Sequence, residues 1–229
     1  FSLTAHPAPR TTAPAPASAD SVLDRALSEM GGEATARRVT RARFETLTLW
    51  HRMTFENRPF GEGIASYERG SELRDYAIGG WRNTRRFISG APTSIEIVDV
   101  VTDTVAARFA PPAPTAERQW GPLSVAYVDE RDELFSLAPE RLLLAARAAD
   151  DRRPLADTTI DGARYARVTA TVAGVRHALY LRRGDGLLAF TAFRAAQPRD
   201  FGLAPYGTMD VEVWYSRWQL VPLTGTPGL

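Results

Sequence analysis

The sequence has no cysteine and no lysine, because all 28 basic residues are arginine. The absence of cysteine excludes disulfide bonds, thiolate metal sites, a catalytic cysteine and a lipid-modified N-terminal cysteine. No apolar run approaches the ~18 residues of a membrane-spanning helix. The formal net charge of +1 gives no strong field that would attract nucleic acid. The arginine bias reflects either a GC-rich genome or selection for bidentate and stacking contacts that lysine does not make.

The sequence also lacks a recognisable catalytic or metal-binding signature. Its three histidines, His6, His51 and His177, have neither ligand spacing nor a nucleophile and orienting group beside them. His177 shares strand parity with Val175 and Leu179, which favours a core histidine over a catalytic base. A run of acidic residues lacks the spacing of a calcium loop and is expected to favour a helix dipole instead. This run comprises Asp129, Glu130, Asp132 and Glu133. We therefore expect a protein that is not an enzyme and has no metal and no cofactor.

The first 19 residues are rich in alanine, proline and threonine, which is typical of an extended polyproline-like arm. The chain begins at Phe1 without an initiator methionine. This favours removal of a signal peptide over an arbitrary boundary, and predicts a periplasmic or other extracytoplasmic location. We expect residues 20–221 to form a single domain and residues 222–229 to form a C-terminal tail.

Period-two alternation of apolar and polar residues predicts β-strands over much of the chain, most clearly from Arg164 to Val172. Ala173-Gly174 then predicts a tight turn. Amphipathic stripes predict helical regions at Asp20–Met30 and Asp129–Asp150. The expected fold is α+β, with one large curved antiparallel sheet of roughly eight to eleven strands and two main helices on its concave face.

Two shorter segments carry separate predictions. Ala110–Pro122 contains four prolines and one tryptophan, so we expect a loop, and its length is typical of a functional loop. Ser124–Val128 is expected to form a short strand. In the preceding long strand from Gly61 to Tyr76, Tyr67 and Leu73 are among the large residues.

Four features resemble a known family over about residues 20–220. They are the first helix ending in Gly31-Gly32, the long opening strands, the helix Leu137-Ala138-Pro139-Glu140-Arg141-Leu142-Leu143, and the closing Tyr215-Ser216-Arg217-Trp218. The pattern is similar to the half-barrel of the periplasmic lipoprotein-carrier family, and to the accessory domain in front of some exported metallo-β-lactamase-fold proteins. The resemblance implies an open half-barrel whose lining holds an acyl chain or a protein segment. Metal-dependent hydrolysis is not implied, because no His-x-His-x-Asp-His motif follows Trp218.

Aromatic and arginine residues supply the candidate binding surfaces, since tryptophan, tyrosine and arginine are enriched at interface hot spots. The alternative is that they are core aromatics and solvated strand-face arginines. The expected partner contacts of the arm and the proline-rich loop are Phe1, Leu3, Pro7, Pro9 and Trp120. A second candidate binding face comprises Trp81, Arg85, Arg86, Trp214 and Arg217.

The preferred functional hypothesis is a non-catalytic exported accessory or scaffold subunit, bound through its arm to a larger protein assembly. The assembly that fits this hypothesis best is a membrane complex, such as a respiratory or photosynthetic one, with the subunit bound at its periplasmic face. Because the sequence shows no membrane span and no lipid anchor, a location at the membrane would need a protein partner. The alternative is a periplasmic carrier of a lipid, a lipoprotein acyl chain or another hydrophobic ligand. A carrier needs an apolar cavity of about 300 Å³ or more.

Overall fold

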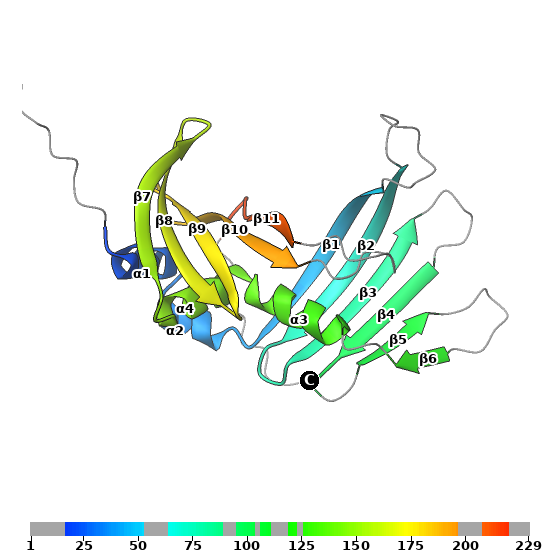
Figure 1. Ribbon diagram of the computed structural model, residues 1–229. Coiled ribbons are helices and arrows are strands. Elements are labelled where there is room, and N and C mark those ends of the chain that lie inside the picture. The colour runs from blue at the N-terminus through cyan, green and yellow to red at the C-terminus, as the bar shows by residue number, and fades with distance from the viewer. Residues whose placement is uncertain are drawn as a thin grey trace, which may run out of the picture. The chain divides into compact units, whose positions relative to one another are not determined.

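The computed structural model describes residues 17–52, 64–88, 95–103, 106–110, 119–122, 126–196 and 208–219. This part of the chain contains four helices and eleven strands (Figure 1). The helices are α1 (Ala19–Glu29), α2 (Glu33–Arg38), α3 (Ala126–Ser136) and α4 (Pro139–Ala148). None of these described helices combines the length and apolar character needed to cross a bilayer. The chain divides into two compact units, Gly31–Ala145 and the combination of Phe1–Met30 with Ala146–Leu229.

The predicted α+β class is confirmed, and every described strand pair is antiparallel. The strands are divided between a six-stranded and a five-stranded sheet, and in neither do the described edge strands pair to close a barrel. The expectation of a single domain over residues 20–221 stays a prediction. Residues 1–16 of the arm and the whole tail lie outside the described residues.

The five-stranded sheet has the order β11-β10-β9-β8-β7. Its strands are β7 (Arg153–Ile160), β8 (Ala163–Val172), β9 (Val175–Arg182), β10 (Leu188–Ala196) and β11 (Thr208–Trp214). Between β8 and β9, Ala173 and Gly174 adopt φ angles of 48° and 79°. Two successive positive φ angles are the requirement of a type I′ hairpin turn, so the predicted tight turn is confirmed.

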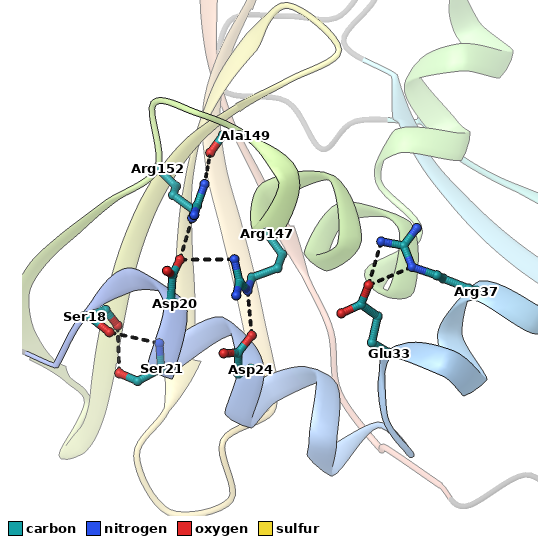
Figure 2. A network of polar contacts seen from close by, with 9 residues as sticks. All are labelled: Ser18, Asp20, Ser21, Asp24, Glu33, Arg37, Arg147, Ala149 and Arg152. Carbon is teal, nitrogen blue, oxygen red and sulfur yellow. Dashed lines mark hydrogen bonds and ion pairs between the residues drawn. The ribbon is translucent and has the colours of Figure 1, made fainter.

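Helix α1 packs its apolar stripe against β8 and is anchored by ion pairs on its polar side. Ser18 caps its N-terminus by accepting a hydrogen bond from the backbone N–H of Ser21 at 3.1 Å. Arg152 donates to Asp20 at 2.5 Å and Arg147 donates to Asp24 at 2.6 Å (Figure 2). The hydrogen bond from Arg152 lowers the pKa of Asp20. Asp20 also lies in the first turn of the helix, where negative charge is favourable.

The six-stranded sheet is a meander, because its spatial order follows the chain order. Its strands are β1 (Arg41–Arg52), β2 (Ile64–Asp75), β3 (Gly80–Ile88), β4 (Ile95–Val101), β5 (Ala106–Ala110) and β6 (Gln119–Pro122). Helix α3 lies across one face of this sheet (Figure 1). Arg74 donates to the carbonyl of Leu134 at 2.8 Å, and the rings of Tyr76 and Phe135 meet edge to face at 5.0 Å.

Two local predictions in this unit were wrong. Residues 126–128, expected at the end of a strand, begin α3 instead. The expected loop Ala110–Pro122 contains strand structure at both ends, since Ala110 ends β5 and its last four residues form β6. The contacts of Arg74 and Tyr76 with α3 explain the helix, because tertiary packing overrides the weak strand preference of a short segment.

Candidate functional site

The two faces of the six-stranded sheet differ in what covers them. Directly opposite residues of antiparallel strands share a face. Arg74, which contacts α3, lies opposite Trp81, so these two residues mark the covered face. The residues of β2 that alternate with Arg74 therefore point to the other face; they are Tyr67, Arg69, Ser71 and Leu73.

On strands β1 to β3, that other face presents exposed arginine and apolar side chains. We name it the arginine face and define it by Arg43, Leu47, Tyr67, Arg69, Leu73, Arg82 and Arg86. Leu47 is 68% exposed, Tyr67 50% and Leu73 45%. All four arginines are exposed as well. Tyrosine and arginine are enriched at protein-binding hot spots, and the exposed leucines beside them add apolar area that can leave water on binding.

The charges of the arginine face are only partly balanced. Arg43 pairs with Glu45 at 2.9 Å, and Arg86 pairs with Glu96 at 3.2 Å. Within the described part of the chain, Arg69 and Arg82 form no ion pair. The register places Arg69 directly opposite Arg86. Two like charges in this arrangement repel each other. A negatively charged group that binds beside Arg69 would therefore be favourable.

The covered face carries a buried ionic network that fixes the strands. Asp99 is fully buried and accepts from Arg85 at 2.5 Å and from Arg108 at 2.6 and 3.1 Å. Glu72 accepts from the indole N–H of Trp81 at 2.9 Å and from Arg74 at 2.5 Å. Together these bonds connect strands β2 to β5 through side chains. Because the acceptors are buried and matched by donors, we assign this network to stability.

The residues of the predicted second binding face are divided between the two compact units and, within one unit, between the two faces of the six-stranded sheet. Trp81 is only 2% exposed and lies with Arg85 on the covered face, whereas Arg86 lies on the arginine face. Trp214 and Arg217 belong to the other compact unit. Trp214 is 56% exposed, and its ring stacks on Phe190 at 4.1 Å. The structure thus brings only Arg86 of this set into the arginine face, and the binding roles of the set stay predictions.

The other predicted contact residues are not tested by the structure. Phe1, Leu3, Pro7 and Pro9 lie outside the described residues. Trp120 belongs to β6, but its side chain also lies outside the described part. Their partner contacts stay predictions.

His177 is a core histidine, as its strand parity predicted. It is 2% exposed, its Nδ1 lies 3.2 Å from Oγ1 of Thr191, and its ring lies 4.6 Å from that of Phe193. Burial lowers the pKa of His177 to about 4. His6 and the side chain of His51 lie outside the described residues, and the described ones contain no group of three or more metal-ligating side chains.

We expect His177 to make the protein less stable in acid. Its folded pKa of about 4 lies below the ordinary value of 6.5, so the unfolded state binds the proton first as pH falls. The loss begins as pH falls through 6.5 and is complete near pH 4, at up to about 3 kcal/mol. Urea unfolding of wild type and His177→Phe at pH 7 and 4.5 should show a loss about 2 kcal/mol larger in wild type. Equal losses in both proteins would exclude this role for His177.

A small hollow of about 200 Å³ lies in the unit that contains the five-stranded sheet. Val22, Ala166 and Leu181 form its apolar lining, together with Ala17, Ser21, Arg25, Arg182, Arg183 and Gly186. Arg183 donates to Asp157 at 2.5 Å and lowers the pKa of that carboxyl. Arg182 pairs with Asp185 at 2.7 Å. The hollow is smaller than the 300 Å³ or so of a typical ligand pocket.

Most of the arginine face was missed by the sequence analysis. The available signal was the period-two spacing of Tyr67, Arg69 and Leu73 in one predicted strand, which places all three on one face. The missing information was the strand register that adds Leu47 and Arg82 from neighbouring strands.

Comparisons with known proteins give a distant structural likeness. No protein-family model and no curated protein matches the chain. One similar structure is a Vibrio parahaemolyticus domain provisionally assigned to outer membrane lipoprotein sorting; it is 10% identical, with a TM-score of 0.35 over 82% of this chain and 86% of that one. Another is MucB in complex with MucA(peri), 15% identical with a TM-score of 0.24 over 76% of this chain.

The chain spans only 48% of the MucB chain. The description of the Vibrio domain agrees with the lipoprotein-carrier part of the resemblance, whereas neither structure is described as a metallo-β-lactamase-fold protein. That second part of the resemblance therefore has no support. With both TM-scores under 0.5, the likeness leaves the function to be argued from the chain's own residues.

Proposed function

We propose that this protein is a non-catalytic accessory subunit that acts outside the cytoplasm and binds a protein partner on its arginine face. The observation that carries the proposal is the exposure of Leu47, Tyr67 and Leu73 among arginines, two of which have no described acidic partner. An apolar side chain gains by leaving water, and an arginine beside it adds a directed charged contact. The Vibrio domain is described for outer membrane lipoprotein sorting, and MucB is described in complex with MucA(peri). The proposal itself rests on the arginine face.

The accessory role combines this face with features of the sequence. The sequence contains no nucleophile–base pattern, which supports a role in binding. The proline-rich arm would supply a second contact, because proline reduces the entropy that a segment loses on docking. A membrane complex with a periplasmic face remains the assembly that we propose for it.

Photo-crosslinking tests the proposed surface directly. We expect benzoylphenylalanine in place of Tyr67 to crosslink to a protein partner in native membrane and periplasmic extracts. The double substitution Arg69→Glu and Arg82→Glu should reduce that crosslink at least about tenfold, because both charges are reversed. Benzoylphenylalanine in place of Thr159, which is exposed on β7 of the other sheet, is the matched control. Absence of a crosslink at Tyr67, or the same crosslink from position 159, would contradict the proposal.

A carrier of a small hydrophobic ligand is the second candidate. The apolar lining of the hollow by Val22, Ala166 and Leu181 favours it. The volume of about 200 Å³ limits the enclosed part of a ligand to a short chain segment. Mass spectrometry of the natively purified protein would reveal copurified lipid, and its presence would move this candidate ahead of the first.

A further inference from the structure

The two arginines without a described acidic partner are held at a defined spacing. Arg82 lies opposite Leu73, and Arg86 lies opposite Arg69. Arg69 and Arg82 therefore lie on neighbouring strands and are offset by four residue positions along them. Strand geometry converts this offset into about 14 Å between their backbone positions.

The surface between the two arginines is low and polar. Ser71 and Thr84 lie opposite one another midway between Arg69 and Arg82. Each arginine also has a leucine directly beside it on the neighbouring strand, Leu47 beside Arg69 and Leu73 beside Arg82. The face thus repeats one unit, an exposed cation next to an exposed leucine, on either side of a strip of short side chains.

The charge pattern distinguishes a protein partner from an anionic bilayer. Glu45 and Glu96 lie on the same face and are partly or fully exposed. A bilayer that presents uniform negative charge would bring these carboxylates against its own charge. A polypeptide can place negative groups at Arg69 and Arg82 and neutral ones elsewhere, and its carboxylates match the bidentate geometry of guanidinium groups.

We infer that the arginine face binds an extended acidic segment of the partner protein, in which two carboxylates four residues apart pair with Arg69 and Arg82. In an extended segment, residues i and i+4 lie on one face and about 14 Å apart, which matches the spacing of the two arginines. On an α-helix the same two residues are only about 6 Å apart. This inference rests on the proposed protein-binding function of the face and adds the chemistry of the partner.

Two synthetic peptides of equal composition test the spacing. Glu-Thr-Val-Thr-Glu carries its carboxylates four residues apart, and Thr-Val-Glu-Glu-Thr carries them side by side. In an NMR titration of the full chain, we expect the first peptide to shift the Nε–H signals of Arg69 and Arg82. It should bind about fivefold more tightly than the second, because only it can pair with both arginines. Either Arg69→Gln or Arg82→Gln should remove the preference, whereas Arg153→Gln, an exposed arginine on β7, should retain it.

The outcomes separate the inference from the function on which it rests. Three outcomes would each overturn the inference that an acidic segment binds this face. They are equal affinity for the two peptides, no signal shift at millimolar peptide, and binding to phosphatidylglycerol vesicles in place of the peptides. If benzoylphenylalanine at position 67 still crosslinks to a protein in that case, the protein-binding function is retained and only the acidic segment is rejected. If the crosslink is absent as well, both the function and the acidic segment are rejected.

Discussion

Replacing Asp99 with alanine is expected to lower the free energy of unfolding of the six-stranded unit by about 3–5 kcal/mol. Asp99 is fully buried and is the shared acceptor of Arg85 and Arg108. Its removal takes the carboxylate away from two guanidinium groups, whose side chains are 19% (Arg85) and 31% (Arg108) exposed. Breaking a buried ion pair by removing one partner costs more than the net value of the pair itself.

The control for this effect is an exposed pair in the same sheet. Glu45 and Arg43 form an ion pair at 2.9 Å, but their side chains are 70% and 71% exposed. Glu45→Ala is expected to cost less than about 1 kcal/mol, because solvent screens the pair. Urea unfolding should be followed by hydrogen exchange of peptides from β3 to β5, since two compact units need not unfold together.

A second variant keeps this prediction testable if Asp99→Ala does not fold. Replacing the triad by Asp99→Leu, Arg85→Met and Arg108→Met removes all three charges and retains comparable volume. We expect this triple variant to be more stable than Asp99→Ala, because it removes the two cations together with the carboxylate that they pair with. A triple variant that is less stable than Asp99→Ala would show that the network contributes more than the compensation of buried charge.

The same network explains why the covered face of the sheet could not be identified from the sequence. In β2, polarity alone would bury Tyr67 and Leu73 and expose Glu68 and Glu72. The structure has the reverse, with Glu68 4% and Glu72 7% exposed and Tyr67 50% exposed. Glu72 is buried because an indole and a guanidinium donate to it. Such donors come from distant positions and satisfy a buried carboxylate only after the register is set.

Local signals were sufficient for the elements that local chemistry determines. The helix near residue 20 and the Ala173-Gly174 turn were predicted because an apolar stripe and a positive-φ glycine are properties of neighbouring residues. Strand β7 was not predicted, because it contains Pro154 near its start and has no fully buried position. The arginine face required both a register and a covering helix, and neither is a local property.

Truncating Phe190 to alanine is expected to cost about 3–5 kcal/mol in the unit that contains the five-stranded sheet. Phe190 is 2% exposed and stacks between Tyr180 at 4.0 Å and Trp214 at 4.1 Å. The register places these three rings side by side on β9, β10 and β11. Removal of the central ring therefore leaves a cavity and breaks two stacked contacts at once.

The substitutions Phe190→Leu and Trp214→Ala separate the two contributions. Leucine fills most of the cavity but cannot stack, so Phe190→Leu should cost about 1–1.5 kcal/mol. Trp214→Ala breaks one stack at a position that is 56% exposed, and should cost about 1 kcal/mol. Urea unfolding monitored by hydrogen exchange of β9 to β11 gives all three values. If Phe190→Ala costs no more than Trp214→Ala, the buried ring does not hold these strands together, and the core of this unit must lie elsewhere in the sheet.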